Sequence, residues 1–309
     1  MLKVFKSAGD VTNYKIILVS IFFILLSIGY AGAETLTVGQ GKAYATIQSA
    51  VNAANPGDVV SVDEGVYSEN VVIKKNGISI MGKNREKTII DGKKASSGIK
   101  IDQTNNVTVS DLTIRNSGAS GKSDAGVTIF SAHNNRVSNL ILTSNLIGIS
   151  IYSESNNNVV SGNSIRSSID DGILIYSSSN NKIFNNNIQE NKIGIYADAA
   201  RTNTIYSNNF IDNTNEQAYD NSGLNSWDDG RTGNYWSTHK TSGAYTISGV
   251  PKAKDNYPLS SPVTIRYEIV PDSGQKKATE ETGRSSPGFE GLVVVLIIAS
   301  VVLIKRWKK

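Results

Sequence analysis

The chain reads Gly98-Ile99-Lys100-Ile101 and then repeats this phrase, a glycine followed by alternating apolar residues, four more times before residue 214. The later copies are Gly126-Val127-Thr128-Ile129, Gly148-Ile149-Ser150-Ile151, Gly172-Ile173-Leu174-Ile175 and Gly194-Ile195-Tyr196-Ala197. The glycines follow one another at steps of 28, 22, 24 and 22 residues. A nearly fixed period in this range is typical of a solenoid, in which each repeat forms one coil.

Each period contains apolar runs that are too short for a helix and are separated by Asn, Ser and Gly. About 22 residues allow three strands of about 4–5 residues and three turns, so the sequence predicts an all-β, right-handed, single-stranded parallel β-helix. Equivalent residues of successive coils should then stack into core columns. Two such columns are Val137, Val160, Ile183 and Ile205, and Leu142, Ile165, Ile188 and Phe210.

Asparagines recur at equivalent positions in two further columns. The first consists of Asn135, Asn158, Asn181 and Asn203, and the second of Asn163, Asn186 and Asn208. A buried amide without a partner costs about 1–3 kcal/mol, so a column in which each amide bonds the next satisfies itself. We therefore predict two internal asparagine ladders, with a row of ligand-binding amides as the alternative.

Both ends of the solenoid carry sequences suited to closing it. Thr46 precedes an apolar stripe at helical spacing and predicts a short helix with Thr46 as N-cap, which would cover the first coil. Trp227 and Trp236 lie within ten residues of each other just after the last coil, with Tyr235 between them. We predict an aromatic lid over the open end, and the alternative is a platform on which a sugar stacks.

Charge and composition exclude several functions. Residues 34–286 carry 24 basic and 25 acidic residues, so no field attracts nucleic acid. The chain has no cysteine and two isolated histidines, His133 and His239. We therefore expect no metal site, no copper site and no cofactor.

Both termini suggest export. Residues 1–33 have a basic start, a 13-residue apolar run and a small-residue cleavage site, which predicts a signal peptide; an uncleaved anchor helix is the alternative. We expect residues 34–260 to form the solenoid with its caps and residues 261–286 a linker. Residues 287–309 consist of a motif, an apolar run and a basic end, which predicts a C-terminal sorting signal with a transmembrane segment; a short membrane anchor is the alternative. Asn106-Val107-Thr108 matches the acceptor pattern for N-glycosylation.

Three carboxylates near the phrase-opening glycines are candidates for catalysis: Asp124, Asp170 and Asp171. Asp124 and Asp170 should lie two coils apart, about 9.6 Å at about 4.8 Å per coil, at the edge of the gap found in inverting glycosidases. Asp170-Asp171-Gly172-Ile173 resembles an acidic turn of polygalacturonases, although the His-Gly and Arg-x-Lys motifs of that family are missing. The simplest interpretation is that these residues are solvated acids in turns and have no catalytic role. A polysaccharide-binding face is an interpretation intermediate between that one and catalysis.

Several phrases resemble known families. Thr46-Ile47-Gln48-Ser49-Ala50 and Asn55-Pro56-Gly57-Asp58 resemble the opening of parallel β-helix proteins such as pectin methylesterases and NosD-like surface proteins. Gly233-Asn234-Tyr235-Trp236 and Asp255-Asn256-Tyr257-Pro258-Leu259 resemble the ending of NosD-like proteins of methanogenic archaea.

Pro287-Gly288-Phe289 in its setting resembles the PGF-CTERM sorting signal of archaea. That resemblance implies cleavage by an archaeosortase-like enzyme and a lipid anchor. The sequence as a whole predicts a non-catalytic, membrane-anchored protein of the archaeal cell surface that meets polysaccharide or other surface proteins. The alternative is a polysaccharide hydrolase or lyase that uses the three carboxylates.

Overall fold

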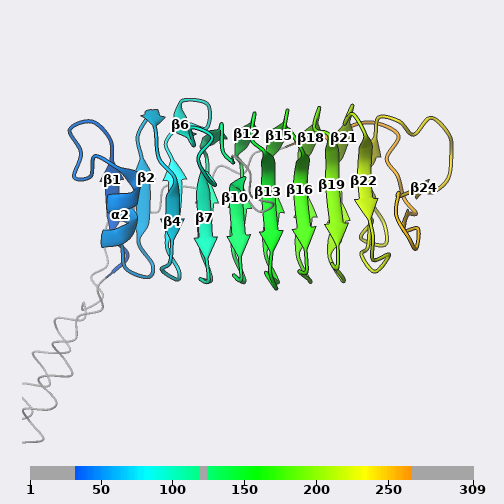
Figure 1. Ribbon diagram of the computed structural model, residues 1–309, viewed down its shortest axis with the longest axis horizontal. Coiled ribbons are helices and arrows are strands. Elements are labelled where there is room, and N and C mark those ends of the chain that lie inside the picture. Colours follow the sequence, from blue (N-terminus) through cyan, green and yellow to red (C-terminus); the bar gives the residue numbers. More distant parts are fainter. Residues whose placement is uncertain (1–31, 119–123, 266–309) are drawn as a thin grey trace, which may run out of the picture. The chain divides into compact units, whose positions relative to one another are not determined.

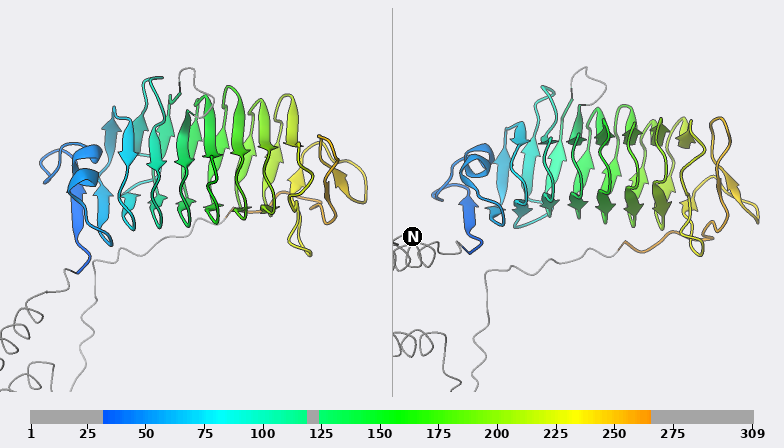
Figure 2. Two further views of the ribbon diagram at one scale, coloured as in Figure 1. Left: turned by 60° about the horizontal axis from the view of Figure 1, so that its bottom comes forward. Right: turned by 90° about the horizontal axis from the view of Figure 1, so that it is seen from below.

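The computed structural model describes residues 32–118 and 124–265, all within one compact unit. Coil follows coil along one axis, and strands from successive coils pair in parallel into three long sheets (Figure 1). Figure 2 turns this stack about its long axis and shows its other sides. The all-β, parallel β-helix fold predicted from the repeat is confirmed.

The three sheets are named here A, B and C. Sheet A consists of β1 (Thr35–Val38), β2 (Val59–Val62), β5 (Ser79–Gly82), β8 (Thr108–Ser110), β11 (Arg136–Ser138), β14 (Val159–Ser161), β17 (Lys182–Phe184) and β20 (Thr204–Tyr206). Sheet B consists of β3 (Gly65–Tyr67), β6 (Thr88–Asp91), β9 (Thr113–Arg115), β12 (Ile141–Thr143), β15 (Ser164–Arg166), β18 (Asn187–Gln189), β21 (Asn209–Ile211) and β23 (Tyr235–Trp236). Sheet C consists of β4 (Val71–Ile73), β7 (Ile99–Asp102), β10 (Ala125–Phe130), β13 (Ile147–Tyr152), β16 (Asp171–Tyr176), β19 (Ile193–Asp198) and β22 (Glu216–Asp220).

The phrase-opening glycines begin the strands of sheet C, and the asparagine phrases lead into sheet A. The core columns stack in the predicted register, Val137 on Val160 in sheet A and Leu142 on Ile165 in sheet B. All eight residues of the two predicted core columns are fully buried. A glycine is needed at this position of β16 because a Cβ on Gly172 would lie 2.6 Å from the carbonyl oxygen of Gly194 in the next coil.

The two asparagine ladders are confirmed. In the first, the Nδ2 of Asn158 donates to the Oδ1 of Asn181 at 3.1 Å, and the Nδ2 of Asn181 donates to the Oδ1 of Asn203 at 2.9 Å. Each Oδ1 also accepts the backbone N–H of the asparagine one coil earlier, as Asn181 does from Asn158 at 2.8 Å. Asn225 extends this ladder by one coil, and Asn234 extends the second.

The two asparagines of each pair do different work. The first residue of the pair, for example Asn157 or Asn180, adopts a left-handed backbone conformation with φ near +60°. Asparagine tolerates this conformation better than most residues. The second residue, Asn158 or Asn181, turns inward and joins the ladder. The pair therefore makes a bend and satisfies the polar groups that the bend buries.

Both ends are closed as predicted. Thr46 caps helix α2 (Ile47–Ala53), accepting the N–H of Ser49, and the helix buries Ile47, Ala50 and Val51 over the first coil. At the other end the ring of Trp236 stacks on Phe210 at 4.2 Å between ring centroids. A short antiparallel pair, β24 (Tyr245–Thr246) and β25 (Lys254–Asp255), follows.

Some predictions concern residues outside the described ones. These are nearly all of the signal peptide at residues 1–33, most of the linker at residues 261–286, and the sorting motif Pro287, Gly288 and Phe289 with its tail. Across residues 32–118 and 124–265, no helix is long and apolar enough to cross a membrane.

We expect the ladder to be a main source of stability. Asn181→Ala removes the amide that accepts the N–H of Asn158 and donates to the carbonyl of Ser155. Two buried backbone groups then lose this partner, so the free energy of unfolding measured in urea should fall by about 3 kcal/mol or more.

Asn187→Ala is the matched control, because this amide lies on the outside of the same coil and, among the described residues, its side chain bonds only that of Gln189. It should change stability by less than about 0.5 kcal/mol. Equal losses in the two variants would contradict the ladder's role.

Candidate functional site

The outer face of sheet C holds a groove of about 650 Å³. It crosses three neighbouring strands, β13, β16 and β19, near the middle of the stack in Figure 1. Its lining combines apolar, aromatic and acidic side chains: Leu146, Ile147, Tyr152, Asp170, Asp171, Leu174, Tyr176, Ile193, Tyr196 and Asp198. This size and mixture are typical of ligand sites.

A small apolar cluster lies under the groove, on the outside of the sheet and separate from the main core. It consists of Ala125, Ile147 and Leu174, with Leu146 and Tyr196 packed against it. The outward column that runs Thr128, Ser150, Leu174, Tyr196 has its smallest side chain at Ser150 and then grows through Leu174 to Tyr196. This gradient hollows the surface over β13 and raises a wall over β19.

A ladder of aromatic rings borders the groove. Phe130 stacks on Tyr152 at 5.9 Å between centroids, and Tyr152 stacks on Tyr176 at 5.3 Å. The next residue in this column is Asp198, paired with Tyr176 in the sheet. The ladder therefore ends at Tyr176, whose side chain is 38% exposed and faces a carboxylate position instead of another ring.

Asp170 and Asp171 are adjacent in sequence but lie in different surroundings. The carboxylate of Asp170 is half-exposed and accepts the Nζ of Lys192 at 2.8 Å. Asp171 is only 6% exposed and has neither a hydrogen bond nor an ion pair to the residues that the structure describes. Burial and then the neighbouring charge of Asp170 raise the pKa of Asp171 to about 7.

The interpretation of both residues as solvated turn acids is therefore wrong for Asp171. The residue takes the sheet position that Ile193 occupies in the next coil, so its carboxyl lies among apolar side chains. An acid that is partly protonated near neutral pH, beside a second carboxyl that is paired with a lysine, suits acid–base chemistry.

A third carboxylate, Asp198, completes the lining, and it was not among the residues selected from the sequence. Burial and then the charge of Asp198 raise the pKa of the Tyr196 phenol. Tyr196 stacks on Tyr219 at 5.3 Å, which holds its ring in place. The sequence does contain a sign of it: Asp198 takes the position that an aromatic residue holds in each of the three preceding coils.

The remaining candidates lie elsewhere. Asp124 is half-buried and is not part of the groove lining. Trp227 and Trp236 are fully or almost fully buried, and their indole N–H groups donate to Asp220 and Asp255 at 3.0 and 2.8 Å. Their rings belong to the closed end of the core and cannot stack on a ligand from solvent.

Tyr235 is half-buried on β23 beside those indoles, away from the sheet C groove. Asn106 is exposed and left-handed at a bend, with its N–H donating to the carbonyl of His133. Glycosylation of Asn106 stays a prediction.

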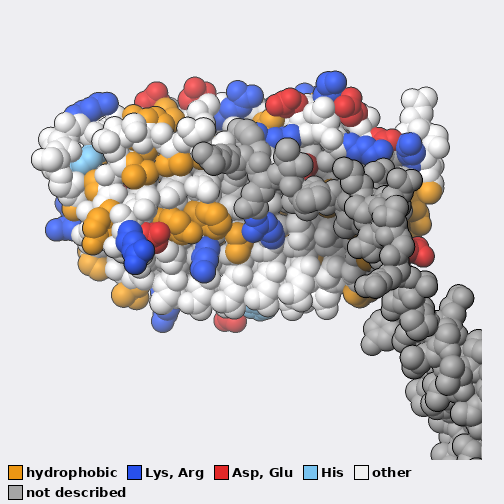
Figure 3. All heavy atoms as spheres, turned by 180° about the vertical axis from the view of Figure 1, so that it is seen from behind, with side chains coloured by type: hydrophobic (Ala, Val, Ile, Leu, Met, Phe, Trp, Pro, Cys, Tyr) orange, Lys and Arg blue, Asp and Glu red, His pale blue; other side chains and the backbone are white. Residues whose placement is uncertain are grey.

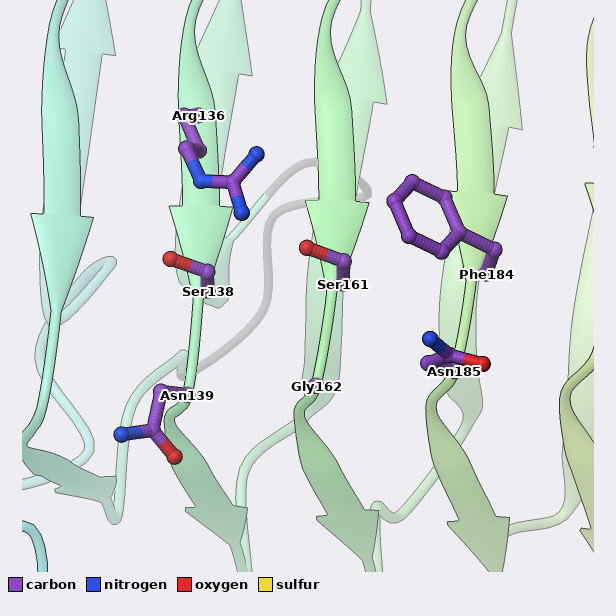
Figure 4. Close-up of a pocket in the computed structure, with 7 residues that line it drawn as sticks. All are labelled: Arg136, Ser138, Asn139, Ser161, Gly162, Phe184 and Asn185. Carbon is purple, nitrogen blue, oxygen red and sulfur yellow. The ribbon is translucent and has the colours of Figure 1, made fainter. Parts of the chain in front are cut away.

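A second hollow lies on sheet A and holds only about 20 Å³. In Figure 4 the side chain of Arg136 and the ring of Phe184 both reach toward β14, where Ser161 and Gly162 leave a notch. That volume is about enough for a single water molecule. Figure 3 shows the molecule from behind, where the visible surface mixes apolar patches with side chains of both charges. The sheet C groove is thus the better candidate for a site.

Residue types that hold copper are few and separated. His133 follows β10, and its Nδ1 accepts the N–H of Asn156 at 3.2 Å. His239 follows β23, about four coils away or roughly 20 Å. Met81 stands alone on β5, and residues 32–118 and 124–265 contain no group of three His, Cys, Asp or Glu placed to hold a metal. The described residues do not fit a copper site.

The raised pKa of Asp171 predicts a pH-dependent stability. The folded chain keeps a proton there that the unfolded chain releases near pH 4, so this carboxyl lowers stability progressively as pH rises from about 4 through 7, by up to about 4 kcal/mol. Asp171→Asn removes that cost. The melting temperature should therefore rise at pH 8 and change little at pH 4.5.

Asp170→Asn is the control for this experiment. It breaks an exposed ion pair worth at most about 1 kcal/mol and also removes the neighbouring charge that raises the pKa of Asp171, so the two effects oppose each other and the melting temperature at pH 8 should change little. A lower melting temperature for Asp171→Asn at pH 8 would show that Asp171 is instead stabilised by its surroundings.

Comparison with solved structures gives distant likenesses. Pectin methylesterase PemA from Erwinia chrysanthemi is 15% identical over 76% of this chain and 91% of its own, with a TM-score of 0.46. Alginate lyase from Paenibacillus sp. str. FPU-7 is 14% identical over 65% and 76%, with a TM-score of 0.45. ORF18 of Geobacillus virus E2 is 15% identical over 76% of this chain, with a TM-score of 0.47, and the chain spans about half of that protein. Nothing about substrate or activity follows from these values.

No curated protein matches the chain. A family of sequences described as periplasmic copper-binding protein (NosD) matches residues 36–257, well over half of the 309 residues. The match begins in β1 and ends just beyond β25, so it covers every coil described above. The periplasmic description agrees with an extracytoplasmic location. The chain belongs to this NosD family, although its described residues offer no set of copper ligands.

Proposed function

We propose that this protein is a cell-surface β-helix protein that binds carbohydrate in the groove on sheet C. The observation that carries the proposal is the joint presence of an apolar floor, an open-ended tyrosine ladder and three carboxylates in one groove. The C–H face of a sugar ring packs on aromatic and aliphatic side chains. Its hydroxyls donate to carboxylate oxygens, which are pure acceptors when ionised.

The rigidity of the scaffold supports binding. The three strands that line the groove are locked in register, Ile149 with Ile173 and Ile173 with Ile195, so the side chains above them are held before a ligand arrives. Sites built on such strands lose little conformational entropy on binding. The groove lies across successive coils, so an extended chain of sugars could continue along the same face.

The proposal also places the protein in the archaeal envelope, exported by residues 1–33 and attached to the membrane by residues 287–309, the latter after processing by an archaeosortase-like enzyme. The sequence patterns of the two ends support this part. Mass spectrometry of the native protein tests it, since an intact carboxyl terminus at Lys309 would overturn processing.

Binding should depend on the end of the tyrosine ladder. Tyr176→Ala removes the exposed ring and should weaken binding of an oligosaccharide about tenfold in calorimetric titration, a loss of about 1.4 kcal/mol. Tyr176→Phe keeps the ring and should retain most of the affinity.

Phe184→Ala is the matched control. Phe184 stacks on Tyr206 at 5.3 Å in the same manner, but on sheet A beside the small notch. Binding should be unchanged in this variant. A weakening in Phe184→Ala equal to that in Tyr176→Ala would place the ligand elsewhere.

A second candidate function is cleavage of the bound polysaccharide. The contrast between Asp171, whose pKa is raised to about 7 by burial, and Asp170, paired with Lys192, favours it. A protonated Asp171 could donate to a leaving oxygen while an ionised carboxylate assists on the other side. The same mixtures, assayed for new reducing ends or unsaturated products, test this function. Activity that survives in Asp171→Asn would exclude Asp171 as the acid.

A further inference from the structure

We propose that the groove on sheet C selects a sugar that carries a protonated amine, such as a hexosamine unit with a free amino group, and that Asp171 is the partner of that ammonium. This inference rests on the proposed function, because it assumes that carbohydrate occupies the groove. It adds the chemical class of the ligand and the residue that recognises it.

The first argument is the charge of the lining. The groove contains the carboxyl groups of Asp170, Asp171 and Asp198, and none of its lining residues is basic. The nearest cation, Lys192, already pairs with Asp170 at 2.8 Å. A uronate would bring a further negative charge into this groove, whereas an ammonium would reduce the repulsion among the charges already there.

The second argument is independent of the number of acids. Asp171 is 94% buried, lines the groove, and has no donor among the described residues. A buried carboxylate without a partner is costly, and a donor that carries positive charge removes the cost most effectively. Because Asp171 borders open space, that donor can come from a ligand. A neutral hydroxyl could also donate, but it would not offset the charge of Asp170 next door.

The third argument comes from the aromatic ladder. At one end, the Nζ of Lys100 lies over the ring of Phe130 at 4.7 Å from its centroid. At the other end, Tyr176 is partly exposed and Asp198 holds the next position in the column. An ammonium or the polarised C–H groups beside it can lie against that ring and be attracted by its negative face. The ladder thus holds a cation at its Phe130 end, outside the groove lining, and leaves an aromatic ring and a carboxylate in the groove at its Tyr176 end.

The test compares three ligands of the same length with the purified full chain. They are a tetramer of glucosamine, the same tetramer with every amine acetylated, and a tetramer of galacturonate, titrated calorimetrically at pH 6.5. The glucosamine tetramer should bind at least about tenfold more tightly than the acetylated one, and the galacturonate tetramer most weakly. Rising salt should reduce the preference for the amine.

Asp171→Asn should lower affinity for the glucosamine tetramer about tenfold and leave affinity for the acetylated tetramer within about twofold. Asp124→Asn is the matched control, since Asp124 lies near the start of a neighbouring sheet C strand but outside the groove lining, and it should change neither value.

The outcomes separate the two levels of the argument. Equal or tighter binding of the acetylated or galacturonate tetramer overturns the inference and leaves carbohydrate binding standing. So does an amine preference that is unchanged in Asp171→Asn. Failure of all three tetramers to bind overturns the proposed function together with the inference.

Discussion

Successive coils of this protein are bonded by parallel backbone pairing and, from Val107 onward, also by the amides of buried asparagines. These asparagine amides matter because the bends between strands would otherwise bury backbone N–H and C=O groups that have no partner in a sheet. In the ladder, one Oδ1 accepts two donors from the preceding coil, as Asn203 does from Asn181, and its own Nδ2 reaches onward. The ladder amides are therefore paired from coil to coil, which holds neighbouring coils in register.

The same requirement governs the ends. A solenoid that stopped abruptly would leave its last ladder amides and its last apolar layer exposed. At the end of the first ladder the Nδ2 of Asn225 donates to the carboxylate of Asp220, and at the end of the second the backbone N–H of Asn234 donates to the carboxylate of Asp255. These two buried carboxylates also accept the indole N–H groups of the lid. The same two carboxylates, Asp220 and Asp255, therefore satisfy the last ladder asparagines and hold the aromatic lid that covers the core.

The sequence was sufficient for the fold because the period, the glycine column and the asparagine columns all require neighbouring coils to stack in register. It was insufficient for the groove because a hollow on a flat sheet depends on differences in side-chain height between coils. Ser150, Leu174 and Tyr196 occupy one column, and only their order along the axis makes a floor and a wall. Asp171 was selected from its place beside a glycine, but its burial depends on Ile147 and Ile193 from adjacent coils, which no local pattern reveals.

The break in the aromatic column has a consequence for how such a surface changes over evolutionary time. The column holds aromatic rings at Phe130, Tyr152 and Tyr176 and a carboxylate at Asp198 in the next coil. The groove lies at this change from ring to carboxylate. Because each coil repeats the same backbone, exchanging the residues of two neighbouring coils would move the recognition surface along the axis by about 4.8 Å without altering the scaffold. The position of the groove along the axis can therefore change through outward-facing residues alone, while the inward-facing residues that determine the fold stay the same.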